Sequence, residues 1–247
     1  MLQGLYNLTS GVLTQNRNLN VISNNMVNVS TPGFKSDTMV STSFKDEMLY
    51  RSSNQGTGAN VPIGNTSRIR TAQETLTDYQ QGSLEETGGT LDLAIAGDGF
   101  FVIQGQGGNV YTRNGSFTLD EQGYLTLPGI GRVMGKNGPL LLNDDKINID
   151  TEGIIRNEDG VNLGTLRLVD FANYDNLQKN KAGYFTGANP YDLPGSFVHK
   201  AVEKSNISVV SEMTKMMTSQ RAIQSAAQVI KIYDQMMQKV TNEIGRL

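Results

Sequence analysis

The chain has 247 residues, no cysteine, and 21 basic against 24 acidic side chains, which gives a formal net charge of −3. Its length allows one large domain or two ordinary ones. The lack of cysteine excludes disulfides, thiolate metal sites and cysteine nucleophiles. Basic and acidic residues are nearly balanced, so the sequence gives no sign of the basic face that nucleic-acid binding requires.

We expect no membrane-spanning helix, because no run of about twenty apolar residues occurs. Residues 1–16 contain no Lys or Arg and no continuous apolar stretch, so they do not resemble a cleaved secretory signal. The protein is therefore expected to be cytoplasmic, or exported by a route that uses no cleaved signal.

Residues 1–29 are predicted to form the first helix, because apolar residues recur there at alternating steps of three and four. Gly4 and Gly11 each cost about 1 kcal/mol relative to alanine, so we expect this helix to be marginal until it packs. Residues 30–33 (STPG) predict that the helix stops and a type II turn follows. The apolar seam of this helix consists of Leu5, Leu8, Val12, Leu19, Ile22 and Met26.

Residues 31–66 are predicted to be a connector, and their polar, Gly-containing part at 50–63 a linker or exposed loop. Beyond them the pattern changes to short strand-like segments separated by Gly-bearing turns. Because no helix long enough for a parallel crossover lies between these segments, we predict an antiparallel meander or small barrel over residues 67–204. The predicted strands are 68–77, 91–96, 100–104, 110–113, 117–119, 124–127, 147–149, 154–156 and 163–169.

Residues 209–246 are predicted to form a second, longer helix with a heptad-spaced apolar seam. A narrow seam buries little surface when a helix is alone, so each terminal helix must pack against the other or against another subunit. Five methionines at 213–217 and 236–237 fit either ordinary helix packing or an adaptable binding surface. The seam consists of Ile223, Ile230, Tyr233, Met237, Val240 and Ile244, and its upstream part is predicted to be Val209, Met213, Met216 and Gln220.

These elements together predict an α+β fold. Its terminal helices, at residues 1–30 and 205–247, are expected to form a discontinuous coiled-coil domain. The connector at 31–66 and the antiparallel β-rich body at 67–204 are inserted between them.

No catalytic, cofactor or metal site is predicted, and we do not expect an enzyme. The single histidine, His199, stands in a loop-like stretch without a nucleophile motif and is expected to be a solvated surface residue. Residues 143–150 lack the glycine and glutamate of a calcium loop, and residues 129–135 are one residue too long for a dinucleotide fingerprint. Four acids precede glycines at strand junctions, where aspartate is typical of turns: Asp98, Asp120, Asp150 and Asp159.

Four separated stretches of the sequence carry a further signal. They are residues 23–35 (SNNMVNVSTPGFK), 93–102 (LAIAGDGFFV), 111–117 (YTRNGSF), and 205–213 (SNISVVSEM) followed by 220–222 (QRA). In this order they resemble the rod and hook family of axial proteins of the bacterial flagellum. The chain's length is similar to that of a rod subunit. Residues 133–140 (VMGKNGPL) resemble the proximal rod member, whereas residues 49–50 and 234–239 are similar to the distal one. Residues 223–227 depart from the pattern, since the family often has Tyr-Glu and Asn there.

The resemblance implies a structural, self-assembling subunit of the flagellar basal-body rod, the drive shaft that joins motor to hook. It implies contacts with copies of the chain and with other rod and hook subunits. It also implies export by the flagellar type III apparatus, without a cleaved signal, to the basal body in the periplasm or cell-wall zone. Within this family, Asn28, Pro32, Gly33 and Phe34 match a signature turn.

Phe44 and Met48 resemble the family's export-gate pattern, although an amphipathic turn would give the same spacing. The alternative function is a secreted β-rich module that binds cell-wall glycan or protein and carries an oligomerising coiled coil. Such a module would expose aromatic side chains, and its candidates are Phe100, Phe101, Tyr111, Phe117 and Tyr124.

Overall fold

The structure, a computed structural model, describes residues 2–43, 46–51, 61–67, 70–105, 107–180 and 182–244. The chain forms two compact units. The helical unit comprises residues 1–27, 37–78 and 208–247, and the β unit comprises residues 28–36 and 79–207. The segment expected to be a connector, 31–66, therefore supplies residues to both units.

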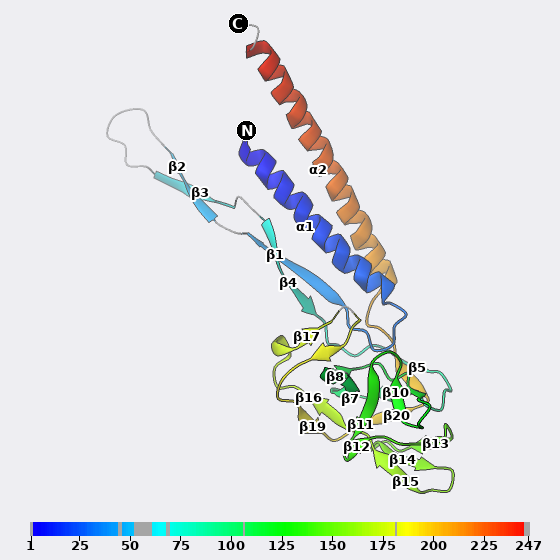
Figure 1. The fold of residues 1–247 in the computed structure, drawn as a ribbon. Coiled ribbons are helices and arrows are strands. Elements are labelled where there is room, and N and C mark those ends of the chain that lie inside the picture. Colours follow the sequence, from blue (N-terminus) through cyan, green and yellow to red (C-terminus); the bar gives the residue numbers. More distant parts are fainter. Residues whose placement is uncertain are drawn as a thin grey trace. The chain divides into compact units, whose positions relative to one another are not determined.

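Two long helices form the centre of the helical unit, which confirms the helices predicted at the two ends of the sequence (Figure 1). Helix α1 spans Leu2–Val27 and helix α2 spans Val209–Ile244. A turn ends α1, in which the Thr31 N–H donates to the Asn28 carbonyl at 3.1 Å. At the other helix Glu212 occupies the first turn, where the helix dipole favours a negative charge.

The two helices run antiparallel in a heptad register. Asn18 lies opposite Ser219, with 3.1 Å between the amide nitrogen and the hydroxyl oxygen, and a Cβ on Gly4 would lie 2.8 Å from the Tyr233 hydroxyl. Nearer the other end, Asn25 lies opposite Glu212. Steps of fourteen and seven residues along α1 thus match equal steps backwards along α2. Contacts that recur at multiples of seven residues are typical of a coiled coil, in which the side chains repeat every two turns.

Four strands complete the helical unit. Strand β1 (Asp37–Ser43) pairs antiparallel with β4 (Arg70–Thr77), and β2 (Asp46–Arg51) pairs antiparallel with β3 (Val61–Ser67). Strands β1 and β4 both contact α1. The expectation of a linker over 50–63 was wrong at both ends, where β2 and β3 extend into it. The polar side chains of this segment give no strand pattern in the sequence, although β2 and β3 pair there through backbone hydrogen bonds.

The β unit is built from antiparallel strands, as predicted (Figure 1). Its largest sheet has the order β17-β18-β8-β7-β11-β10-β9, with β12, β16 and β19 attached off this path. The β unit also contains a three-stranded sheet β13-β14-β15 and the pairs β20-β6 and β21-β5. The strands are β5 (Leu84–Glu86), β6 (Leu93–Ile95), β7 (Phe100–Gly105), β8 (Gly108–Thr112), β9 (Thr118–Leu119), β10 (Leu125–Leu127), β11 (Gly131–Gly135), β12 (Gly138–Pro139), β13 (Ile147–Ile149), β14 (Ile154–Asn157), β15 (Asn162–Thr165), β16 (Leu168–Asp170), β17 (Gln178–Lys179), β18 (Phe185–Thr186), β19 (Tyr191–Leu193), β20 (Phe197–His199) and β21 (Ala201–Glu203), with a short 3-10 helix η1 (Tyr174–Asn176) after β16.

Strand β7 separates two apolar cores. Its side chains alternate between them, because successive residues of a strand point to opposite faces. Phe101 and Ile103 belong to the larger core, and Phe100 and Val102 belong to the smaller one. All four are buried, which explains why this strand reads as a continuous apolar run.

The register of the helix pair can be tested with cysteines, since the chain contains none of its own. The double variant Asn18→Cys/Ser219→Cys is expected to form a disulfide within one chain on mild oxidation. The matched pair Asn18→Cys/Gln220→Cys should not, because Gln220 is exposed one position away. Gel mobility of the monomer with and without reductant measures the outcome. Equal oxidation of both variants would contradict the register.

Candidate functional site

Most residues of the predicted seam are partly buried in the helical unit. Ile22 is buried, and Met237 and Val240 are 44% and 39% exposed. Ile244 lies in α2, but its side chain is outside those that the structure describes. The predicted seam residues of intermediate burial are Leu5, Leu8, Val12, Leu19, Met26, Ile223, Ile230 and Tyr233.

The upstream part of the α2 seam was predicted in the wrong phase. Met213 and Gln220 are exposed, whereas Glu212 and Ser219 are buried and Met216 is partly buried. Glu212 and Ser219 are polar and so do not contribute to the apolar pattern. They are nevertheless buried, because their polar groups have partners on α1. Polar residues at the correct heptad spacing were the signal that could have identified them.

Asn25 and Glu212 form a buried polar layer at this end of the helix pair. The Glu212 carboxylate accepts from Lys215 at 2.6 Å and from the Asn25 amide at 3.4 Å. Asn25 also accepts from the Asp37 N–H at 3.0 Å and donates to the Asp37 carbonyl at 2.8 Å. One amide thus fixes α1 against both α2 and β1. A polar layer of this kind specifies register, because any shift would leave buried groups unpaired.

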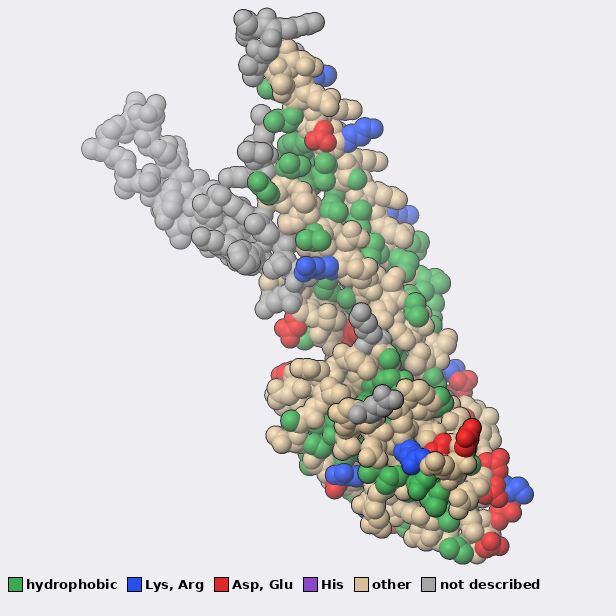
Figure 2. Space-filling view, in the orientation of Figure 1, with side chains coloured by type: hydrophobic (Ala, Val, Ile, Leu, Met, Phe, Trp, Pro, Cys, Tyr) green, Lys and Arg blue, Asp and Glu red, His purple; other side chains and the backbone are tan. Residues whose placement is uncertain are grey.

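The outward faces of the helix pair expose large apolar side chains (Figure 2). On α1 they are Tyr6, Leu13 and Val27, which are 66%, 56% and 80% exposed and lie seven or fourteen residues apart. Arg17 is the single charged residue among residues 2–27. A helix that faces water normally carries charges on that side, so this composition is typical of a surface covered by a partner. On α2 the exposed apolar residues are Val209, Val210, Met213, Met217, Val229, Ile232, Met236, Met237 and Val240.

A buried ionic cluster lies within the β unit. The Glu203 carboxylate accepts from Lys35 at 2.6 Å and from Arg113 at 3.2 Å, and its first oxygen also accepts from the Gly82 N–H at 3.0 Å. Lys35 donates to the Gln80 carbonyl at 2.8 Å. The three charged side chains are at most 3% exposed. Both cations therefore share one carboxylate that is shielded from water.

The family-signature turn is packed against this cluster. The Gly33 N–H donates to the Glu203 carbonyl at 2.7 Å, and its φ of 66° is of the sign that a type II turn requires. Any Cβ at this position would overlap the backbone of Arg113. Phe34 is buried beneath the Lys179 ammonium, which lies 3.9 Å from its ring centre. Gly33 and Phe34 therefore have structural roles in the β unit.

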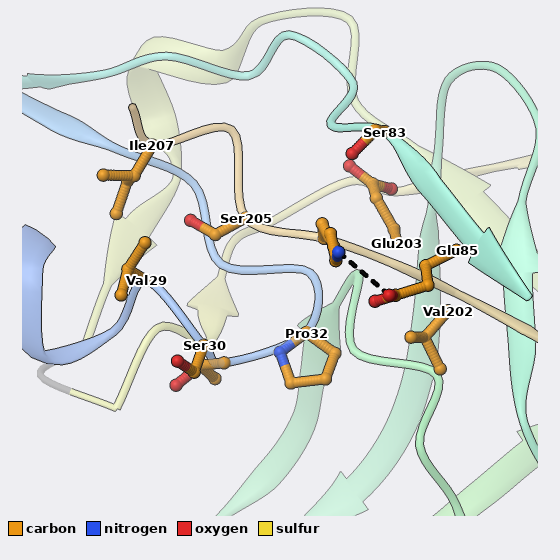
Figure 3. Close-up of a pocket in the computed structure, with 11 residues that line it drawn as sticks. Val29, Ser30, Pro32, Ser83, Glu85, Val202, Glu203, Ser205 and Ile207 are labelled. Carbon is orange, nitrogen blue, oxygen red and sulfur yellow. Dashed lines mark ion pairs between the residues drawn. The ribbon is translucent and has the colours of Figure 1, made fainter. Parts of the chain in front are cut away.

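A recess of about 470 Å³ lies beside this turn (Figure 3). Its wall combines apolar side chains such as Val29 and Pro32 with the hydroxyls of Ser30, Ser83 and Ser205. The Ser205 hydroxyl is buried and makes no hydrogen bond within the described part of the chain. Glu85 and Lys204 form an ion pair of 2.9 Å along the same wall. Its lining residues include no histidine, so the recess lacks a nucleophile with an adjacent imidazole base.

Two chemical candidates from the sequence have structural partners. His199 lies in β20, partly buried, with its Nε2 2.8 Å from the Thr90 carbonyl oxygen, so the expectation of a solvated loop residue was wrong. Loss of solvent alone would raise the pKa of Asp120, but N–H donors from Tyr124 and Gln122, together with Arg132, hold that pKa below its usual value. Across the described ranges, no three side chains are grouped so that they could hold a metal ion.

Asp170 is the acceptor for two tyrosines. Its carboxylate accepts from the Tyr174 hydroxyl at 2.8 Å and from the Tyr191 hydroxyl at 3.1 Å. Burial, and then the bond to Asp170, raises the pKa of Tyr174 well above its usual value. Both hydroxyls therefore stay protonated at neutral pH and serve to satisfy a carboxylate that is only 6% exposed.

The aromatic candidates for a glycan-binding face lie inside the protein. Phe100, Phe101, Tyr111 and Phe117 are buried. Tyr124 is partly buried, and its ring is covered by Arg132 at 4.0 Å. Such positions suit a core and leave no flat aromatic surface of these residues for a sugar ring.

Two further observations concern export and membranes. Phe44 lies outside the described residues, and Met48 lies in β2 opposite Asn65, with no description of its side chain. In the part of the chain that the structure covers, neither helix is long and apolar enough to cross a membrane.

The weight of the buried cluster in stability can be tested by comparing Lys35, which pairs with Glu203 inside the protein, with Lys204, which pairs with Glu85 at the surface. Lys35→Met removes one of the two cations that neutralise the buried Glu203 carboxylate. It is expected to lower the free energy of unfolding by about 3–5 kcal/mol. The same change at Lys204, whose ion pair is half exposed, should cost at most about 1 kcal/mol. Urea unfolding followed by circular dichroism compares the two. Equal losses of unfolding free energy in the two variants would show that the buried ion pair does not stabilise the protein more than the exposed one.

Three family models match the chain in the order of its elements. They are the flagella basal body rod protein model over residues 5–35, the flagellar hook protein FlgE/F/G D1 domain model over residues 94–165, and the flagellar basal body rod FlgEFG protein C-terminal model over residues 198–243.

Full-length relatives agree with these matches. The flagellar basal-body rod proteins FlgG of Buchnera aphidicola subsp. Schizaphis graminum and of Bacillus subtilis are each 33% identical to the chain, over 98% of the chain and 99% of the relative. The flagellar basal-body rod protein FlgF of Caulobacter vibrioides is 29% identical over 98% of both chains. The chain therefore belongs to the flagellar basal-body rod protein family.

Proposed function

We propose that this chain, a structural subunit of the flagellar basal-body rod, assembles with its neighbours through the outer surface of its paired terminal helices. The observation that carries the proposal is the exposed apolar surface of α1 and α2, including Leu13 at 56% and Ile232 at 53%. Burying such side chains against a neighbour is favourable by roughly 25 cal/mol per Å² of apolar surface. The neighbours are copies of this chain and other rod and hook subunits.

The geometry of the pair supports an open assembly. The exposed stripes of α1 and α2 are different surfaces of one subunit, so a contact between them is heterologous. Heterologous contacts that do not close into a ring produce helical filaments. Long helices packed along such a filament also resist torsion, which is the mechanical demand on a shaft. The secreted binding module is not favoured, because four of its five candidate aromatics are buried.

We also propose export through the flagellar type III apparatus without a cleaved signal. The observation that supports this proposal is the family to which the chain belongs. In this proposal the export gate recognises Phe44 and Met48. The chain is then not an enzyme but a building block delivered to the basal body.

Assembly through the helix surface predicts a specific loss. Ile232→Glu should abolish incorporation into basal bodies and swimming, because a charge would be buried in the subunit contact. The stability of the monomer should not change, since this side chain is already half exposed. Immunoblots of isolated basal bodies measure incorporation. Gln228→Glu, an equal charge at an exposed polar position of α2, is the control and should assemble normally. Normal swimming of the Ile232 variant would reject the proposal.

The export proposal predicts a defect that precedes assembly. The double variant Phe44→Ala/Met48→Ala should accumulate inside the cell and be depleted from the exported fraction. Tyr50→Ala, a comparable loss of a large side chain in β2, should be exported as usual. Urea unfolding of the purified variants checks that folding is preserved. Unchanged secretion of the double variant would exclude the gate role.

A further inference from the structure

The sequence contains the dipeptide Asn-Gly twice, at residues 114–115 and 137–138. This dipeptide is chemically labile, because the backbone nitrogen of the glycine can attack the side-chain carbonyl carbon of the asparagine. Glycine has no side chain that hinders the attack, and its backbone readily adopts unusual conformations. The two dipeptides are identical but have different surroundings, so the fold decides which of them reacts.

The first dipeptide is held firmly in the β unit. The Asn114 side-chain oxygen accepts from the Ser116 N–H at 3.0 Å, and the Asn114 N–H donates to the Thr112 hydroxyl at 3.0 Å. Gly115 is buried, its carbonyl accepts from the Leu93 N–H at 3.0 Å, and a Cβ on it would overlap the Leu93 carbonyl. Ring closure at Asn114 would have to rotate this side chain and the adjoining peptide, and so break these contacts.

The second dipeptide lies in an exposed turn. Strands β11 and β12 pair Gly135 with Gly138, which leaves Lys136 and Asn137 as the two residues of a hairpin turn. Asn137 is exposed, and its side chain makes no hydrogen bond within the residues that the structure describes. A Cβ on Gly138 would meet no other atom within 4 Å, so open space surrounds this glycine.

The hairpin requires the residue types that make its turn labile. Gly138 has a φ of 130°, a backbone conformation that favours glycine, and asparagine is a common turn residue. Strand β12 has two residues, so few backbone hydrogen bonds hold this end of the hairpin and local opening costs little free energy. The turn can therefore reach the geometry of ring closure without unfolding of the β unit.

We propose that Asn137 is a site of spontaneous deamidation in the folded protein, whereas Asn114 is protected. The Gly138 nitrogen bonds to the side-chain carbonyl carbon of Asn137, and the bond from that carbon to the amide nitrogen breaks. Ammonia leaves with the proton of the Gly138 nitrogen, and a succinimide ring remains. Water opens the ring at either carbonyl, which gives aspartate or isoaspartate. One water is consumed and one ammonia is released, without oxidation or reduction.

The modification changes both the charge and the backbone of the turn. Each event adds one negative charge to a chain of formal net charge −3. Isoaspartate also adds one methylene to the backbone between Lys136 and Gly138, in a turn whose length sets the register of its strands. The inference is independent of the proposed assembly through the helices, because all of these residues belong to the β unit.

Incubation of the purified full-length chain at mildly alkaline pH tests the proposal. Mass spectrometry of tryptic peptides, corrected with a sample taken at time zero, measures the conversion of amide to acid. Cleavage after Arg113 and Lys136 places the two asparagines in different peptides. Conversion in the folded chain is expected to be faster at Asn137 than at Asn114 by a factor of about ten or more. Equal rates, or a faster reaction at Asn114, would overturn the proposal.

Two controls separate the effect of the fold from that of the local sequence. In urea the two asparagines should react at similar rates, because the contacts around Asn114 are lost. If Asn137 reacts in urea but not in the folded chain, the native turn protects it and the proposal fails. Asn137→Gln should form almost no acid at this turn, since ring closure from glutamine is much slower. Acid that persists in the same peptide of this variant would come from Asn143 and reject the assignment.

The products identify the route of the reaction. Isoaspartate, detected by methyl transfer from an isoaspartyl methyltransferase, is expected in the aged natural chain and not in Asn137→Gln. Aspartate without isoaspartate would indicate direct hydrolysis of the amide and reject the role of the Gly138 nitrogen. Equal urea midpoints of the fresh natural chain and the variant establish that both are folded.

Discussion

The carboxylate of Glu203 is the contact on which the β unit depends, because it joins segments that are distant in the chain. Its two oxygens accept from Lys35, which follows the signature turn, from Arg113, which follows β8, and from the backbone of Gly82. A buried charge without its partner is far more costly than an exposed one. The turn after α1 therefore has a fixed position in the β unit, and the glycine and phenylalanine beside Lys35 complete that packing.

The helical unit separates the groups that determine its own structure from those that remain available to neighbours. Inside, Asn25, Glu212 and the Asn18–Ser219 pair use polar contacts that determine which residues meet. Outside, large apolar side chains are exposed on both helices and α1 is almost uncharged. Polar contacts inside a helix pair add specificity more than stability. The pair is thus well defined in register, while much of its apolar surface can still be buried by assembly.

The helices, their heptad period and the antiparallel β body could be predicted from sequence, because each produces a repeating pattern over many residues. The phase of the upstream α2 seam could not, since Glu212 and Ser219 are buried only through partners about two hundred residues away. Strands such as β5, β20 and β21 have three residues each and are specified by pairing with distant strands. The same holds for His199, whose burial follows from its place in β20. The heptad spacing of Tyr6, Leu13 and Val27 on α1 is visible in the sequence, but their exposure is a tertiary property.

The separation of partners along the chain has a consequence for synthesis. Lys35 and Glu203 are 168 residues apart, and Asn18 and Ser219 are 201 apart. Contacts of such high contact order form late, because a long loop must close before they contribute. A nascent chain that still lacks its last fifth has neither the carboxylate for Lys35 nor a partner for α1. Both units can therefore close only after their C-terminal partners, Glu203 and Ser219, have been synthesised.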